Sequence, residues 1–185
     1  ASAFSYFGHM WELYTFWAFT PFLLSAYSVM HPGGHFNISL WSFFIIGAGG
    51  IGCVAGGIVS QKVGSARVAF VQLCLSGLCC LLLPLFLGLQ FPLFVAAMVF
   101  WGIVVVGDSP QFSSLTAAFS PKELVGSALT ISNCIGFGIT IFSIQLTGWL
   151  ASVIPPQYIT ISLVVGPALG LMYLRPLLSR RVTRR

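Results

Sequence analysis

Long apolar runs alternate along this chain with short clusters of polar, glycine and proline residues. A helix that crosses a membrane needs about 20 mostly apolar residues, and breaker clusters divide the sequence into six runs of that kind. The pattern therefore predicts an all-α integral membrane protein, folded as one unit over residues 1–185. We expect its six transmembrane helices at residues 4–30, 40–60, 68–88, 91–118, 124–153 and 158–174.

Composition excludes a water-soluble domain. Only 6% of the residues are charged, 57% are hydrophobic, and the mean hydropathy is +0.98, which would leave very large apolar patches exposed to water. All the cysteines fall inside apolar runs, so we expect them to pack as small hydrophobic residues and not to form a disulfide framework. They are Cys53, Cys74, Cys79, Cys80 and Cys134.

The basic residues predict the orientation of the chain. Lys62 and Arg67 lie in the second connection, Lys122 lies in the fourth, and the others lie in a tail at 175–185, whereas the first, third and fifth connections have none. Cytoplasmic loops collect Lys and Arg, so we expect both termini to be cytoplasmic. The tail could also bind anionic lipid or nucleic acid, but membrane-helix flanks have the same composition, so no nucleic-acid partner is expected. The tail bases are Arg175, Arg180, Arg181, Arg184 and Arg185.

The six runs repeat with a period of three. The first and fourth carry the acids Glu12 and Asp108, the second and fifth carry small residues at helical spacing, and the third and sixth are mainly Leu, Val, Ile and Phe. Since three is odd, the second triplet must run opposite to the first, which is an inverted-topology 3+3 repeat. The small residues that allow close helix packing are Ala48, Gly52, Gly56 and Ser60, then Gly126, Thr130, Cys134 and Gly138.

Two stretches resemble a known family. Residues 57–67 contain Gly57, Lys62, Gly64 and Arg67 at the spacing of the loop signature of the major facilitator superfamily, although Gln61 replaces the acidic position. The stretches His9-Met10-Trp11-Glu12-Leu13-Tyr14 and Gly107-Asp108-Ser109-Pro110-Gln111-Phe112 look like the seventh and tenth helices of bacterial members.

This resemblance implies half of a twelve-helix transporter in the bacterial inner membrane. Helices one and four would line a central cavity, three and six would face lipid, and two and five would face a second half. That half would be an N-terminal half or a second copy of the chain. In a dimer, helix two of one copy would pack on helix five of the other.

Asp108 is the leading candidate for function, because a carboxylate at bilayer depth costs roughly 2.5–3.5 kcal/mol on insertion scales and normally marks a pathway. Pro110 is expected to interrupt the same helix and to free the carbonyl of Val106. Glu12 and Asp108 should lie at matched depths of roughly 12–15 Å, with Asn133 at a similar level. The alternative for Asp108 is a structural hydrogen bond to a freed backbone group or to Asn133.

The neighbours of the two acids extend the candidate site. His9 lies three residues from Glu12 and Gln111 three from Asp108, hence on shared helix faces. Tyr14, with other aromatic residues of the first run, could form a wall of the site. The alternatives are a hydrogen-bonded Glu12 near the headgroups with His9 as its neighbour, and aromatic residues of the interfacial belt.

Other chemistry finds little support in the sequence. His31 and His35 have metal-ligand spacing, but the intervening Pro32-Gly33-Gly34 favours an ordinary external loop. The glycine-rich residues 47–57 lack the ending of a phosphate-binding loop. No convincing Ser-His-Asp or metal-ligand set is present, so we expect no enzyme, metal or cofactor.

We therefore expect secondary active transport of a small polar or anionic solute by alternating access, and the two buried acids permit coupling to protons. The alternative is a membrane scaffold or sensor of the same fold, which would bind a partner protein and transport nothing.

Overall fold

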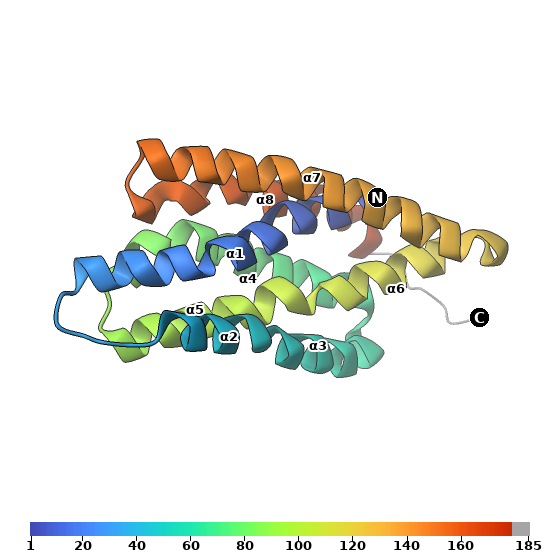
Figure 1. The fold of residues 1–185 in the computed structure, drawn as a ribbon. Helices are drawn as coiled ribbons and strands as arrows, with labels where there is room; N and C mark the ends of the chain where they lie inside the picture. The colour runs from blue at the N-terminus through green and yellow to red at the C-terminus, as the bar shows by residue number, and fades with distance from the viewer. Residues whose placement is uncertain (179–185) are drawn as a thin grey trace.

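A computed structural model describes residues 1–178, and these fold entirely into helices and their connections (Figure 1). The predicted tail residues Arg180, Arg181, Arg184 and Arg185 lie outside this range. Two 3₁₀ segments, η1 (Lys122–Leu124) and η2 (Pro156–Val164), each lead directly into an α-helix. The α-helices are α1 (Ser2–Met30), α2 (Ile38–Gly47), α3 (Gly49–Val63), α4 (Ser65–Leu87), α5 (Phe91–Gly107), α6 (Ser109–Phe119), α7 (Val125–Val153) and α8 (Val165–Leu178).

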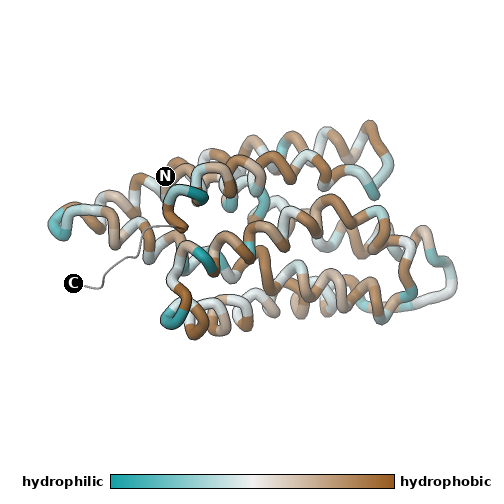
Figure 2. Tube along the Cα trace, turned by 180° about the vertical axis from the view of Figure 1, so that it is seen from behind, coloured by the Kyte–Doolittle hydropathy of each residue, from teal (hydrophilic) through white to brown (hydrophobic). Residues whose placement is uncertain are grey.

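Five segments are long and apolar enough to cross a membrane, which suggests a multi-pass membrane protein. Figure 2 shows hydrophobic residues along most of the helices, with hydrophilic residues concentrated at the turns. The first predicted run forms the long helix α1, which is not among the five. The five segments are Ile38–Val63, Ser65–Leu87, Phe91–Phe119, Lys122–Val153 and Pro156–Leu178.

Several predicted boundaries are wrong. The second run is interrupted at Ala48 and the fourth at Asp108. The expected loop at residues 61–67 is a turn at Gly64, whose φ of 91° is a left-handed conformation that glycine adopts without strain. Arg175 lies in the last turn of α8 and not in a tail, because that helix continues to Leu178.

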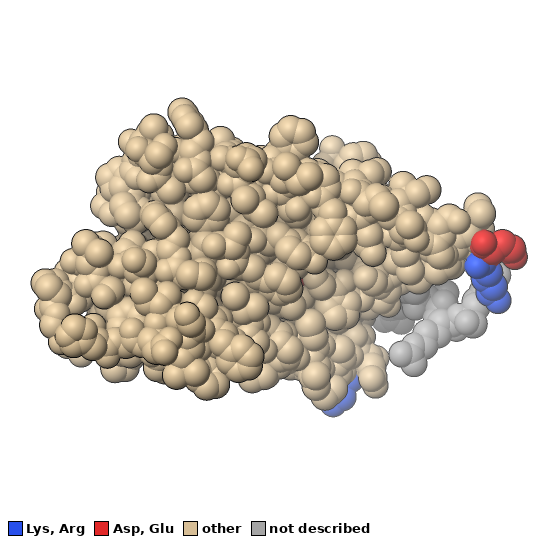
Figure 3. Space-filling model, in the orientation of Figure 1, with Lys and Arg blue, Asp and Glu red and all other residues tan. Residues whose placement is uncertain are grey.

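The helices run along a common direction and their connections alternate between the two ends of the molecule (Figure 1). The α3–α4 and α6–α7 connections lie at one end, and the exposed charged residues among those described lie there too. In Figure 3, blue and red atoms are seen only toward that end, and the other described residues of the visible face are uncharged. This distribution follows the predicted alternation of basic and non-basic connections.

Glycines set the spacing between neighbouring helices. Gly52 of α3 lies against the backbone of Ile103 in α5, and Gly102 of α5 lies against the backbone of Ile45 in α2, so neither position has room for a side chain. The small-residue stripe of the second run therefore packs inside the chain, which differs from the expectation that it faces a second half. Close backbone approach of this kind is how small residues stabilise membrane helix pairs.

Helix α7 is the most exposed of the five spans. This differs from our expectation that the third and sixth runs are the ones that face lipid. Its Gly136 and Thr140 are buried, and Gly136 lies against Tyr6 and Met10 of α1. The opposite face, which includes Thr130 and Cys134, is exposed.

Candidate functional site

The interruption between α5 and α6 brings Asp108 into the interior of the molecule. Asp108 has helical dihedral angles, but the regular hydrogen-bonding pattern stops there, and Ser109 and Pro110 begin α6. Pro110 lacks a backbone N–H, so the carbonyl of Val106 cannot receive its usual bond. Instead, the Cys53 thiol from α3 donates to that carbonyl at 3.6 Å. The expected interruption is observed, but the Val106 carbonyl is not left free, because it also accepts from the backbone N–H of Asp108.

His9 of α1 contacts both residues at this junction. Its Nδ1 lies 2.9 Å from Oδ1 of Asp108, and its Nε2 lies 2.7 Å from the hydroxyl oxygen of Ser109. His9 is 1% exposed and Asp108 is 0% exposed, whereas Ser109 is only half-buried. Neither Asp108 oxygen has a well-oriented hydrogen-bond partner among the described residues. The pair is therefore close but incompletely satisfied, which is costly for a buried carboxyl group.

Glu12 lies one helical turn from His9, in a different environment. Its Oε1 accepts hydrogen bonds from the Trp101 indole at 2.9 Å and the Cys80 thiol at 3.3 Å, and its Oε2 accepts one from the Ser76 hydroxyl at 2.9 Å. All four side chains are fully buried. Since Ser76 and Cys80 belong to α4 and Trp101 to α5, Glu12 joins three helices.

The remaining predicted site residues are dispersed. Gln111 is buried on α6, one turn beyond Asp108. Tyr14 is half-buried, and its ring packs against Trp17 and Phe137 at centroid distances of 5.1 and 5.2 Å, so it belongs to an aromatic contact between α1 and α7. Asn133 is exposed on α7, whereas Asp108 is fully buried. The suggested hydrogen bond between these two residues is not formed.

The loop-signature residues lie apart from the two acids. Gly57 is half-buried in α3, Gly64 forms the turn, and Lys62 and Arg67 are exposed on the helix ends beside that turn. They shape one end of the molecule and do not contact Glu12 or Asp108 in any described interaction.

Sequence reasoning missed several partners. Ser76, Cys80 and Trp101 are ordinary residues of apolar runs, and only the folded arrangement directs them at Glu12. Ser109, by contrast, directly follows Asp108 and could have been considered with it. We expected no Ser-His-Asp set, yet Ser109, His9 and Asp108 have the connectivity of one.

The backbone that follows Ser109 offers no free donor beside its hydroxyl group. Pro110 has no N–H, and the N–H groups of Gln111 and Phe112 both donate to the Asp108 carbonyl, at 3.0 and 3.1 Å. An oxyanion site requires free N–H groups near the serine, and residues 110–112 supply none.

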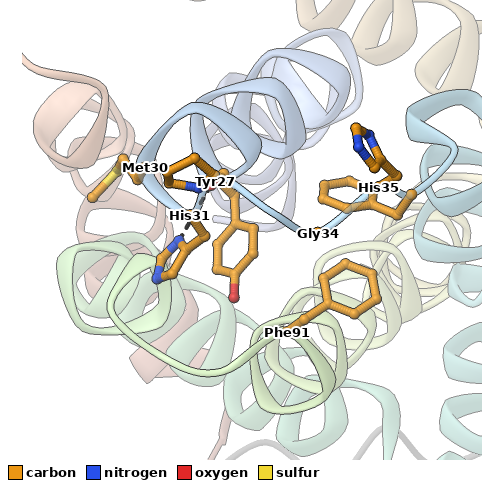
Figure 4. A pocket seen from close by; sticks show the side chains of 8 residues that line it. Tyr27, Met30, His31, Gly34, His35 and Phe91 are labelled. Atoms are coloured by element: carbon orange, nitrogen blue, oxygen red, sulfur yellow. Dashed lines mark hydrogen bonds between the residues drawn. The ribbon is translucent and has the colours of Figure 1, made fainter.

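A separate cavity of about 520 Å³ opens beside the α1–α2 connection (Figure 4). Tyr27, Phe36 and Phe91 form much of its wall. His31 stacks on Tyr27 at 4.2 Å, and Figure 4 shows His35 on the opposite side of the pocket. The two histidines do not converge on one point, and no cluster of three or more metal-ligating side chains occurs within residues 1–178.

Comparison with known proteins gives no identification: no protein-family model and no curated protein matches this chain.

Proposed function

We propose that this protein is a secondary active transporter of a small polar or anionic solute, working by alternating access. The observation that carries the proposal is the buried Asp108, which contacts His9 at a helix interruption. Ionisable residues at membrane depth are expensive and mark substrate or proton pathways by default. Interrupted helices with free backbone groups are likewise typical of transporter binding sites.

The helix contacts support a six-helix half-unit of the major facilitator type, with α1 as the sixth span. The contact of α1 with α7 corresponds to the contact of α5 with α3. The contact of α1 with α8 corresponds in the same way to the contact of α5 with α4. Exchanging the first triplet for the second reproduces these contacts, as an inverted repeat requires. Both termini would then be cytoplasmic and the location would be a bacterial inner membrane.

The second half would cover the exposed face of α7. Thr130, Asn133 and Gln145 are exposed on that helix, and polar side chains of this kind are unfavourable against lipid tails. Either an N-terminal half or a second copy of the chain could supply the cover, and the lipid bilayer would surround the assembly.

The proposal is tested by transport in proteoliposomes. The full chain is reconstituted with an internal pH-sensitive dye and challenged with radiolabelled carboxylates, amino acids and sugars. We expect uptake of at least one class by the wild-type protein, and we expect Asp108→Asn to abolish uptake or to uncouple it from proton movement. Glu123→Gln is the matched control, because Glu123 is exposed on η1 and should not affect transport.

Full coupled transport by Asp108→Asn would refute the role of Asp108. Absence of uptake for every class, with protein that is folded and correctly inserted, would favour the alternative of a scaffold or sensor. Capture of one specific protein through α7, undisturbed by Asp108→Asn, would support that alternative.

A further inference from the structure

The two buried acids differ in how fully their oxygens are satisfied. An ionised carboxylate has about four acceptor positions, and Glu12 uses three of them for Trp101, Cys80 and Ser76. No described donor with good geometry serves either oxygen of Asp108. Glu12 is thus held by side chains of two other helices, whereas the side chain in contact with the Asp108 carboxyl group among the described residues is His9.

His9 is the link between the buried acid and a more accessible group. Its Nδ1 faces Asp108, which is fully buried, and its Nε2 faces Ser109, which is half-buried. A histidine changes charge near neutral pH more readily than any other side chain, and it can take a proton at one nitrogen while the other faces an acid. The three groups therefore form a short path from the surface of α6 into the interior.

The surroundings of His9 contain few competing charges. The rings of Tyr6 and of Phe112 in α6 are tilted against the imidazole, at centroid distances of 5.9 and 5.6 Å. Glu12 lies one turn away on α1. Helices α7 and α8 present glycine to this part of α1, since Gly136 contacts Met10 and Tyr6, and both Gly166 and Gly170 contact Gly8. Asp108 is thus the one acid in direct contact with the ring among the described residues.

We infer that His9 is the group that takes up and releases the coupled proton, that Ser109 connects it to the outside, and that Glu12 is a positioning residue. The inference rests on the proposed transport function. On uptake, a water-borne proton passes to the Ser109 oxygen while the Ser109 hydroxyl proton moves to Nε2 of His9. The positive charge of the imidazolium formed is balanced by the adjacent Asp108 carboxylate, and the proton stays on His9. Release reverses both transfers, so the protons balance.

The test reads the protonation of His9 directly. The full chain is labelled with ¹⁵N-histidine in a His31→Gln, His35→Gln background, so that His9 is the one histidine, and its imidazole signals are followed in nanodiscs by NMR as pH is varied. We expect charged and neutral forms to interconvert. In Asp108→Asn the balance between charged and neutral imidazole at fixed pH should change, because the ring loses the carboxylate that it contacts.

Four further variants separate a relay role from a structural one. Ser109→Ala should slow the exchange between charged and neutral His9, and Ser109→Thr, which keeps the hydroxyl, should restore it. Glu12→Gln should leave the exchange in place, and Glu123→Gln should be identical to the wild type.

A His9 imidazole that stays neutral at every pH would overturn the inference. So would a charged fraction of His9 that does not change in Asp108→Asn, or a proton-exchange rate that does not change in Ser109→Ala. These outcomes are independent of transport. If His9 titrates as expected while proteoliposomes move no solute, the proposed function fails and the proton-binding role of His9 remains.

Discussion

Glu12 should make a large contribution to the free energy of unfolding. Glu12→Ala removes the common acceptor of three buried donors. The Ser76 hydroxyl has a second acceptor, the Leu73 carbonyl at 3.2 Å, so Trp101 and Cys80 are the donors left without a partner. An unsatisfied buried polar group costs about 1–3 kcal/mol, which gives a loss of about 2–6 kcal/mol in the free energy of unfolding.

The measurement is reversible unfolding of the full chain in bicelles, with helicity as the signal. Glu123→Ala is the control, since an exposed acid at the surface should change stability by less than about 0.5 kcal/mol. A Glu12→Ala protein within 1 kcal/mol of the wild type would show that the three hydrogen bonds do not hold α1, α4 and α5 together.

Two other predictions concern packing and chemistry. Gly52→Ala should destabilise the protein by about 1–3 kcal/mol in the same unfolding assay, because the added methyl would overlap the carbonyl of Ile103. Gly50→Ala on the same helix has nothing within 4 Å and should be neutral or stabilising, so equal losses for both variants would contradict this account of the α3–α5 contact. Ser109 should not be labelled by a fluorophosphonate probe, since Pro110 lacks an N–H and the next two N–H groups are engaged. Covalent labelling of Ser109 that disappears in His9→Gln would instead indicate an enzyme.

The broad architecture was predictable because membrane helices are specified by local composition. Runs of apolar residues separated by breakers identify the spans, and five of the six expected runs are confirmed as long enough and apolar enough. The interruption at Asp108 was predictable too, since the effect of Pro110 on Val106 follows from covalent geometry. Helix ends were less predictable: α4 begins at Ser65 because one glycine suffices for the turn, which no count of polar residues reveals.

The candidate site was predictable only in part. Helical spacing predicts His9 and Glu12 on one face, and both side chains are buried. Nothing in the spacing indicates that the two acids have separate partners from different helices. Depth along the helix was also a poor guide to contact, because Asn133 matches the expected level of Asp108 but lies on an exposed face of α7. Rotation about the helix axis decides such contacts, and it depends on packing.

The interruption of the helix explains why one imidazole can serve two consecutive residues. In a regular helix, neighbouring side chains are separated by about 100° around the axis, and residues i and i+1 do not face a common partner. At the α5–α6 junction the hydrogen-bonding pattern stops at Asp108 and restarts at Ser109, and both side chains reach His9. The proline that weakens the backbone thus also brings the acid and the hydroxyl to opposite nitrogens of one ring. The proposed proton path through Ser109 and His9 therefore depends on the irregular backbone at this junction.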